Sequence, residues 1–441
     1  MTVTGIIAEY NPLHKGHEYQ LAEARRLTGA DYVAVVMSGC FTQRGTPAVL
    51  DKYERTRMAL SCGADLVLEL PVRFSCASAE YFASGAVSVL NSLGCVDWLC
   101  FGSECGDTEA IRRAASLLAE AETSPEYRQR LRSAQKAGLS FPAARSLALE
   151  AFPGLEPSLF SLPNNILGIE YCRALSVRHS SIRPLAISRK GDYHDTRLRE
   201  SEGTVFSSAS AIRAALSQEA SGEKLICTEG SSAGKDSSAA AAQKLRRSLP
   251  DASFRLLFGR QDGRGILTEE DFSLPLRCRL LQLLEANALP EKAGSLTDFA
   301  DISPALADKI EKQLYLFSGW KDLCGLLHSR DLPYARASRA LCHILLDLRQ
   351  DGLDQSKAEG FPVYLRMLGF SRRALPLLSE IKKRAASPLL SRLTAAKEQL
   401  PETLLPLLTE EIRASHIYQA AVSGRYGTPF LNEYQRQMIS F

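Results

Sequence analysis

Two histidines near the amino terminus have the type and spacing of a phosphate-binding pair. They occur in Glu9-Tyr-Asn-Pro-Leu-His14-Lys-Gly-His17, directly after the apolar residues 3–8. If a helix begins there, its free N–H groups and its dipole favour an anion. The intervening glycine lets a phosphate approach the backbone, and both imidazoles can donate hydrogen bonds to it. His14 and His17 are therefore predicted to hold the α- and β-phosphates of a nucleotide; the alternative is two surface histidines at a helix start.

A second phosphate-binding turn is predicted near residue 210. The segment Phe206-Ser-Ser-Ala-Ser-Ala-Ile-Arg213 places hydroxyl groups at a helix start and a guanidinium group further along. Serine caps helices, and arginine can grip phosphate oxygens with two parallel hydrogen bonds. Ser210 and Arg213 are candidates for the β- and γ-phosphates, although an ordinary capped helix gives the same pattern.

Three further positions lie where a nucleotide crevice is expected. Arg189 and Lys190 end the last predicted strand with adjacent cations, which fit either a phosphate contact or a solvated charge cluster. Gly102 follows another strand, where bare backbone could accept adenine or ribose, or where it is a turn glycine. Asn165 begins a helix and has an amide able to read a base edge, or is a helix cap.

The elements that must position these residues alternate between strands and helices. Apolar runs typical of buried strands occupy residues 3–8, 32–37, 66–70, 98–101 and 182–187, and helical spacing occupies residues 17–28, 52–62 and 79–93. This alternation predicts a doubly wound α/β domain with a parallel sheet. Such sheets bind ligands at the carboxyl ends of their strands, where the residues above fall.

The chain is expected to contain two domains. Its 441 residues are roughly three times a typical domain of ~150 residues. Residues 1–217 form the predicted α/β domain, with a helical insertion at about 107–175. Residues 218–243 are rich in Ser, Ala, Gly and Lys, and they predict a linker or mobile loop. Residues 244–441 have Leu-rich helical spacing interrupted by proline, which predicts a second, mainly helical domain.

Composition excludes several protein classes. With 45% hydrophobic and 23% charged residues, the chain is neither disordered nor fibrous. It has no apolar run of ~20 residues and no signal-peptide pattern, so we expect a cytoplasmic protein with no membrane partner. Eleven cysteines without a Cys-x-x-Cys pair support neither a disulfide framework nor a thiolate zinc site, and no protein metal site is expected. A net charge of +3 is too small to argue nucleic-acid binding.

Several motifs together resemble the bacterial tRNA(Met) cytidine acetate ligase family. They are Ile7-Ala-Glu-Tyr-Asn-Pro-Leu-His-Lys-Gly-His17, which contains the H-x-G-H of adenylyl-transferring enzymes, Met37-Ser-Gly-Cys-Phe-Thr-Gln-Arg-Gly45, Gly63-Ala-Asp-Leu-Val-Leu-Glu-Leu-Pro71, Ser78-Ala-Glu80, Phe101-Gly-Ser-Glu104, Asn164-Asn-Ile-Leu-Gly168, Tyr193-His-Asp195, Tyr334-Ala-Arg-Ala-Ser-Arg339 and Arg366-Met-Leu-Gly-Phe370. The resemblance implies a nucleotidyltransferase-like, Rossmann-like catalytic domain. Cys40 departs from the Ser-Gly-Asn-Phe pattern expected there, so position 40 is given no role.

The resemblance also implies a reaction. ATP and acetate would give acetyl-adenylate and pyrophosphate, and the acetyl group would pass to N4 of the wobble cytidine of elongator tRNA(Met), forming N4-acetylcytidine. Mg²⁺ carried with ATP would neutralise the pyrophosphate, and the cytosine would be splayed out of the anticodon loop. The implied contacts with ATP are Ile7, Ala8, Glu9, Tyr10, Asn11, Pro12, Leu13, His14, Lys15, Gly16, His17, Glu18, Tyr19, Gln20, Gly102, Asn165 and Arg189.

A local basic patch is the candidate surface for the tRNA backbone. Nine basic and two acidic residues lie between Lys357 and Lys397, a balance of +7. Its proposed contacts are Arg372, Arg373, Lys382 and Lys383. A solvated helical face explains the same charges equally well.

Two other classes of protein stay open from the residues alone. A small-molecule adenylyltransferase would use the same histidines on a phosphorylated substrate and release pyrophosphate without RNA, although ~200 further residues would then need another purpose. A nucleotide sensor would have the crevice without turnover. The sequence does not select the carboxylate, the residues of its pocket, the tRNA or the oligomeric state.

Overall fold

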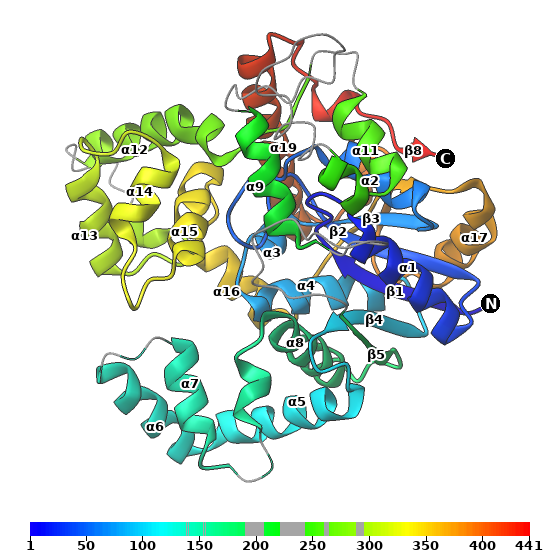
Figure 1. Ribbon diagram of the computed structural model, residues 1–441, viewed down its shortest axis with the longest axis horizontal. Helices are drawn as coiled ribbons and strands as arrows, with labels where there is room; N and C mark the ends of the chain where they lie inside the picture. Colours follow the sequence, from blue (N-terminus) through cyan, green and yellow to red (C-terminus); the bar gives the residue numbers. More distant parts are fainter. Residues whose placement is uncertain are drawn as a thin grey trace.

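Helices surround a central β-sheet (Figure 1). The computed structural model describes residues 1–189 except 138, 140, 153 and 155, together with 207–220, 243–259, 264–287 and 295–441. The strands lie in the order β5-β4-β1-β2-β3-β6-β7, with β8 beside β6. Their bounds are β1 (Val3–Ala8), β2 (Tyr32–Ser38), β3 (Leu66–Leu70), β4 (Trp98–Ser103), β5 (Arg183–Ser188), β6 (Leu365–Phe370), β7 (Leu389–Leu390) and β8 (Ile439–Ser440). Strands β1 to β5 are parallel, as the alternation of strand and helix predicts.

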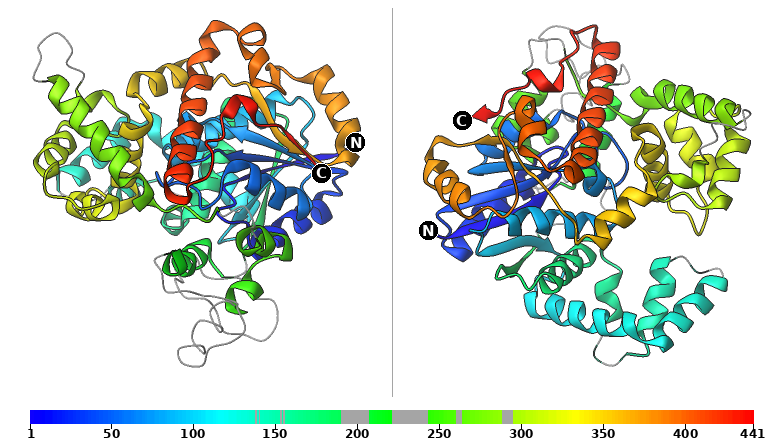
Figure 2. Two further views of the ribbon diagram at one scale, coloured as in Figure 1. Left: turned by 90° about the horizontal axis from the view of Figure 1, so that it is seen from above. Right: turned by 180° about the vertical axis from the view of Figure 1, so that it is seen from behind.

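Helices cover both faces of this sheet (Figure 2). Ile6 and Val35 pack on one face against residues of α1 (Lys15–Thr28), α2 (Lys52–Ser61), α9 (Ala209–Ala220) and α11 (Asp251–Phe258). Ile7 and Val36 pack on the other face with residues of α4 (Ala79–Ser92), α5 (Thr108–Thr123) and α8 (Pro163–Val177). Neighbouring residues of one strand therefore enter different cores, which is the doubly wound arrangement.

The predicted helical insertion spans α5 to α8. Helices α5 and α8 pack on the sheet, whereas α6 (Pro125–Lys136) and α7 (Phe141–Leu149) project from it as a lobe (Figure 1). The short helix α3 (Val72–Ser75) follows β3 on the main body. The chain of the insertion returns to the sheet through the start of α8.

A helical body occupies residues beyond the α/β region. It consists of α12 (Ser273–Asn287), α13 (Pro304–Gln313), α14 (Trp320–Leu327) and α15 (Tyr334–Leu346), and α16 (Gln350–Ala358) follows it. Its core contains the fully buried Trp320 and also Phe41 from the loop after β2. Helices α17 (Leu375–Arg384), α18 (Ala396–Gln399) and α19 (Leu405–Tyr426) complete the carboxyl-terminal part.

The carboxyl-terminal part also extends the central sheet, which helical spacing alone does not predict. Strand β6 runs antiparallel to β3, with Val67 opposite Gly369. Gly369 is needed there because a Cβ atom would lie 2.7 Å from the Thr56 side chain and 2.9 Å from Ile439. The predicted domain boundaries at residues 217 and 244 stay a prediction. Strands from both predicted domains, β1 to β5 before residue 217 and β6 to β8 after residue 244, belong to the same sheet.

A buried ionic cluster joins the two parts of the chain. Lys52 Nζ lies 2.5 Å from Glu69 and 2.7 Å from Glu433. Arg366 lies 2.8 Å from Glu69 and 2.6 Å from Glu433. Burial and the charge of Glu69 raise the pKa of Glu411 to about 8, so this fifth member is protonated at neutral pH. Two cations then balance two carboxylates inside the protein.

Helix α15 is anchored by a buried histidine. His343 Nδ1 lies 2.8 Å from the carbonyl oxygen of Ala300, and Nε2 lies 2.5 Å from that of Cys76. Since carbonyl oxygens only accept hydrogen bonds, both ring nitrogens must donate, and the ring is an imidazolium. Burial lowers the pKa of His343, but contacts with Cys76 and the charge of Asp301 outweigh it and raise the pKa to about 9.

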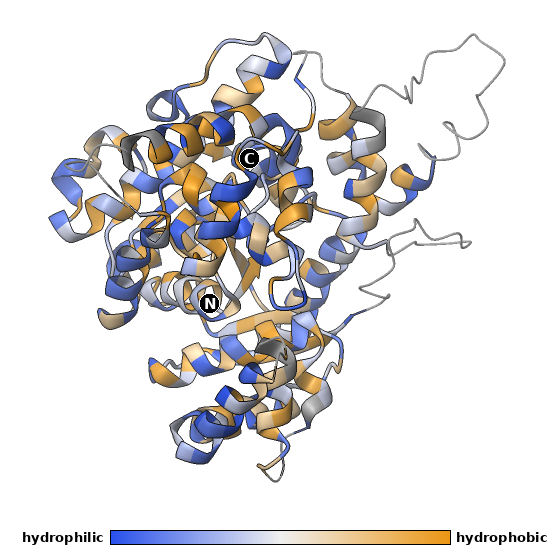
Figure 3. Ribbon diagram, turned by 90° about the vertical axis from the view of Figure 1, so that its left-hand side faces the viewer, coloured by the Kyte–Doolittle hydropathy of each residue, from blue (hydrophilic) through white to orange (hydrophobic). Residues whose placement is uncertain are grey.

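Polar and apolar residues are mixed along the helices (Figure 3). Within the described chain, no helix combines the length and apolar character that crossing a bilayer requires.

Candidate active site

The two histidines of the H-x-G-H motif cap the first helix. His14 is the N-cap residue of α1, and its Nδ1 accepts a hydrogen bond from Gly16 N at 3.0 Å. Nδ1 of His17 accepts one from His14 N at 3.3 Å. A neutral imidazole that accepts at Nδ1 carries its proton on Nε2, so both rings present an Nε2–H donor. The rings stack with centroids 3.8 Å apart.

Both rings are neutral at physiological pH. Burial, aided by the charges of Arg189 and Arg213, lowers the pKa of His14 to about 3. Burial also lowers the pKa of His17 well below its ordinary value, and the same cations add to this effect. Tyr10 packs its ring edge against His17 at 5.0 Å. The pair is therefore a fixed set of neutral donors, which suits electrostatic stabilisation of a phosphate better than acid catalysis.

Two partly buried cations lie beside the histidines. Arg213, on α9, donates to the carbonyl of Asn11 at 2.8 Å and to Ser210 Oγ at 3.1 Å. Arg189 follows β5 and donates to Asn164 Oδ1 at 3.1 Å. Burial lowers the pKa of both guanidinium groups. In the described chain no carboxylate forms an ion pair with Arg213. An anionic ligand would therefore compensate the free-energy cost of removing this charge from water.

Asn165 shapes the end of β4. Its Oδ1 accepts hydrogen bonds from Ser103 Oγ at 2.8 Å, Glu104 N at 3.0 Å and Cys105 N at 3.2 Å. Its Nδ2 makes no hydrogen bond within the described chain. Glu104 accepts in return from Asn164 and from Asn165 N at 2.8 Å. The turn after Gly102 is therefore held by α8. The expectation that Asn165 caps this helix is wrong, because the N-cap residue is Leu162 and the Asn165 side chain accepts hydrogen bonds from the turn instead.

One cavity brings most of the predicted residues together. It is lined by Ile7, Ala8, Glu9, Tyr10, Asn11, His14, His17, Gln20, Gly102, Arg189, Ser210 and Arg213, all of which are sequence candidates. Pro12, Leu13, Lys15, Gly16, Glu18, Tyr19 and Asn165 do not line it; Leu13 and Asn165 are buried behind its wall. The cavity lies at the carboxyl ends of β1, β4 and β5, as expected for this fold.

Sequence reasoning missed several lining residues. They are Gln43, Arg44, Phe82, Phe101, Asn164, Leu167, Tyr171, Ser208 and Ala209. Ser208 starts α9 and accepts from Ala211 N at 3.0 Å, a cap that the Ser-Ser-Ala-Ser pattern could have indicated. Arg44 lies in the quoted Met37 to Gly45 motif, but no periodicity there predicts that it lines the same cavity as the histidines.

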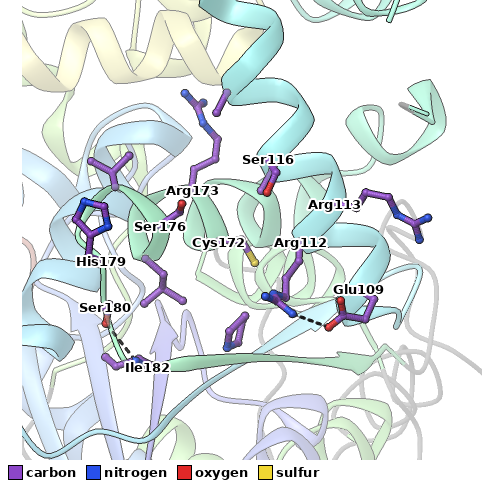
Figure 4. A pocket seen from close by; sticks show the side chains of 15 residues that line it. Glu109, Arg112, Arg113, Ser116, Cys172, Arg173, Ser176, His179, Ser180 and Ile182 are labelled. Atoms are coloured by element: carbon purple, nitrogen blue, oxygen red, sulfur yellow. Dashed lines mark hydrogen bonds and ion pairs between the residues drawn. The ribbon is translucent and has the colours of Figure 1, made fainter. Parts of the chain in front are cut away.

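A second, larger cavity lacks the chemistry of the first. It lies between α5, α8 and β5 (Figure 4), with a volume of about 680 Å³ against about 190 Å³ for the histidine cavity. Two of its three arginines are already paired, Arg112 with Glu109 at 2.9 Å and Arg173 with Glu122 at 2.6 Å, and the third, Arg113, is exposed. Its lining contains a single histidine, His179, and so offers no pair of histidine donors. The smaller cavity is therefore the candidate nucleotide site. Among the described residues no group of His, Cys, Asp and Glu is arranged to hold a metal ion.

The predicted basic patch is divided by the fold. Arg366, counted in its charge, is buried in the ionic cluster and cannot meet a tRNA. Arg373 pairs with Asp65 at 2.6 Å and donates to Asp31 O at 2.8 Å, and Lys383 pairs with Glu380 at 3.0 Å. Arg372 and Lys382 are exposed and have no ion-pair partner in the described chain.

The position of this patch is also informative. Asp31 and Asp65 directly precede β2 and β3, so the patch lies at the amino-terminal edge of the parallel sheet. The histidine cavity lies at the opposite edge.

Three sequence predictions fall outside the described residues. They concern the motifs at Lys190 to Asp192 and Tyr193 to Asp195, and residues 221–242 of the predicted linker.

The fold and the cavity define a class of protein. The chain matches the HIGH Nucleotidyl Transferase family over residues 1–428, which is nearly its whole length, and it belongs to that family.

The relatives define the class more closely. The chain is 39% identical over 423 residues to the tRNA(Met) cytidine acetate ligase of Acetivibrio thermocellus, covering 95% of this chain and 94% of the relative. It is 37% identical over 429 residues to that of Clostridium perfringens, covering 95% of each. Its fold is similar to the crystal structure of Thermotoga maritima TmcAL bound with alpha-thio ATP, with a TM-score of 0.84 and 28% identity over the full length of both chains. The resemblance drawn from the motifs is confirmed: the chain is a member of the tRNA(Met) cytidine acetate ligase family.

Proposed function

We propose that the protein is an ATP-dependent ligase that activates acetate as acetyl-adenylate and transfers the acetyl group to N4 of the wobble cytidine of elongator tRNA(Met). The relatives named above support the reaction. The observation that carries the proposal is the pair of neutral Nε2–H donors at the start of α1, flanked by Arg189 and Arg213.

In the first step a carboxylate oxygen of acetate attacks the α-phosphorus of ATP. The bond from the α-phosphorus to the bridging oxygen breaks, and pyrophosphate leaves with the electron pair. His14 and His17 donate to the oxygens that gain charge, and they lose no proton because they are already neutral. Arg213 and Ser210 hold the β- and γ-phosphates, and Mg²⁺ enters with ATP as part of the substrate.

The apolar side of the cavity suits the adenosine. Phe101, Leu167 and Tyr171 line it beside Gly102, where a base can lie on the backbone. Asn165 has its amide group at the same turn. We propose that Phe101, Gly102, Leu167 and Tyr171 hold adenine while the triphosphate lies on the α1 side. Asn165, behind the wall, supports the turn on which the base lies.

In the second step the N4 amine of cytosine attacks the acetyl carbonyl. The mixed anhydride breaks, AMP leaves with the electron pair, and the amine loses a proton. The cytosine must leave the anticodon stack to reach the cavity. The basic patch with Arg372, Arg373, Lys382 and Lys383 lies at the opposite edge of the sheet from the cavity. It can therefore bind only a part of the tRNA remote from the wobble base.

Exchange of labelled pyrophosphate into ATP tests the first step. We expect exchange that requires acetate and does not require tRNA. Exchange that requires a phosphorylated metabolite instead would identify a small-molecule adenylyltransferase, and ATP binding without exchange would identify a sensor. Either result would refute the proposed activity.

Two variants, each with four substitutions, test the RNA surface. The first neutralises Arg372, Arg373, Lys382 and Lys383. The second neutralises Arg128, Arg130, Arg132 and Lys136 of α6, a lobe that joins the cavity through the start of α8. A variant that removes true contacts spares acetyl-adenylate formation, weakens tRNA binding and reduces its log-log salt slope by about 0.7 to 0.9 per phosphate. Wild-type affinity and slope in the first variant would show that the first patch is only a solvated face.

A further inference from the structure

The loop between β2 and α2 folds into a small hairpin, residues 40–48. Phe41 pairs with Pro47 in an antiparallel bridge, and Thr42 N donates to Thr46 O at 3.0 Å. Gly45 N closes the turn by donating to Thr42 O at 2.9 Å. The tip of this β2–α2 hairpin is therefore Gln43-Arg44-Gly45, which has a defined backbone.

One side of the tip faces the nucleotide cavity. Gln43 N donates to Glu9 Oε1 at 2.8 Å, and Gln43 and Arg44 both line the cavity together with Arg213. The charge of Arg44 contributes to lowering the pKa of Arg213, which indicates that the two guanidinium groups lie near each other. The hairpin thus adds a cation on the side where the triphosphate is proposed to lie.

The base of the hairpin is fixed from within the α/β part. Arg55 is fully buried, and its guanidinium donates to the carbonyls of Glu9 at 2.6 Å and Ser38 at 3.1 Å. It also donates to Leu50 O at 3.0 Å. The ends of β1 and β2 and the exit of the hairpin are therefore tied together, and only the tip needs a further support.

The other side of the tip rests on α15 of the helical body. Ser338 Oγ donates to Gly45 O at 2.9 Å, and Trp320 Nε1 donates to Ser338 Oγ at 3.1 Å. Gly45 has φ of 71°, and a Cβ atom there would lie 2.2 Å from the Cα of Arg339. Backbone therefore meets backbone at this point, and Ser338 sets the height of the tip above the cavity.

We propose that Arg44 binds the pyrophosphate portion of ATP and that Ser338 is the positioning residue that holds Arg44 there. Arg44 would stabilise the charge that collects on the leaving pyrophosphate when the bond to the α-phosphorus breaks. Through Ser338, the helical body then contributes to the adenylation step. This inference rests on the proposed function, because it assigns a part of the same nucleotide site.

Single variants give the first test. Arg44→Ala is expected to raise KM for ATP roughly 10- to 100-fold in the exchange reaction, with KM for acetate unchanged. Arg44→Lys keeps the charge but not the planar guanidinium, so it should restore only part of the loss. Ser338→Ala should raise KM for ATP about two- to tenfold. Arg57→Ala is the matched control, since it removes the same charge from the exposed face of α2.

The double variant separates positioning from general stability. If Ser338 acts through Arg44, then Ser338→Ala has no further effect on KM for ATP in the Arg44→Ala background. If the two effects multiply instead, Ser338 is only structural and its assigned role is wrong. Arg44 is exposed, so its variants test the phosphate contact even if Ser338→Ala does not fold.

Equilibrium titration with ATP keeps this inference separate from the proposed function. Binding of ATP needs neither acetate nor tRNA, so it can be measured even if exchange proves independent of acetate. Weaker ATP binding by Arg44→Ala than by Arg57→Ala supports the inference whatever the second substrate is. Equal affinities for these two variants and the wild type would overturn it.

Discussion

His17 has two functions that substitution can separate. Its Nδ1 accepts from His14 N, which caps the first helix, and its Nε2–H is the donor assigned to phosphate. The side-chain oxygen of asparagine occupies about the position of Nδ1, and the side-chain nitrogen of glutamine about that of Nε2. His17→Asn therefore keeps the cap and loses the donor, whereas His17→Gln keeps a donor and loses the cap.

The expected magnitudes differ for the two variants. Loss of one pre-placed donor to a developing oxyanion lowers the rate roughly 100- to 1000-fold, so His17→Asn should lose this much kcat in pyrophosphate exchange. Its free energy of unfolding should stay within about 0.5 kcal/mol of wild type. His17→Gln should lose about 0.5 to 2 kcal/mol of stability, as other N-cap losses do, and less than tenfold in rate.

The assay combines exchange kinetics with urea denaturation of the same preparations. His14→Ala is the comparison in which cap and donor are lost together. The reasoning fails if His17→Asn exchanges at the wild-type rate. It also fails if the rates of all three variants simply follow their stabilities, since the histidine would then act only through the fold.

Three further predictions concern charge. Arg189→Ala and Arg213→Ala should each raise KM for ATP about tenfold or more, with tRNA affinity unchanged; a change confined to tRNA would place them on the RNA surface. Because the pKa of His343 is raised in the folded state, protonation of its ring stabilises the fold. This stabilisation is complete below pH 6.5 and is lost as the pH rises towards 9. His343→Gln should therefore lose about 3 kcal/mol at pH 6 and much less at pH 9 in urea titrations, and a pH-independent loss would refute the imidazolium. Arg366→Met should destabilise the protein by about 3 to 5 kcal/mol without a specific effect on tRNA binding, as thermal and urea unfolding would report.

Local patterns were sufficient for much of the catalytic fold. The expected strands 3–8 and 66–70 have the same bounds as β1 and β3, and helix 17–28 begins two residues earlier, at Lys15, because His14 itself is the cap. The histidines, Arg189 and Arg213 meet in one cavity because parallel strands end at one edge of the sheet. These predictions depend on residues near each other in sequence or on a general rule of topology.

The remainder depends on contacts between distant residues. Strand β6 lies in a Leu-rich region of helical spacing, and its pairing with β3 joins residues about 300 positions apart, which no local pattern encodes. Arg366 counted as a surface charge because its partners Glu69 and Glu433 lie 297 and 67 positions away in the sequence. Arg44 reaches the cavity only because α15 supports the hairpin.

The pairing of β3 with β6 has a consequence for synthesis on the ribosome. At about 5 to 20 residues per second, the ~300 residues that separate the two strands take roughly 15 to 60 s to be made. During that time the β3 edge is unpaired, and Lys52 and Glu69 lack their carboxyl-terminal partners. The nascent chain therefore presents an unpaired sheet edge of the kind that favours aggregation. The hairpin that carries Arg44 also waits for α15, so a nascent chain cannot complete its nucleotide site before most of the protein has been translated.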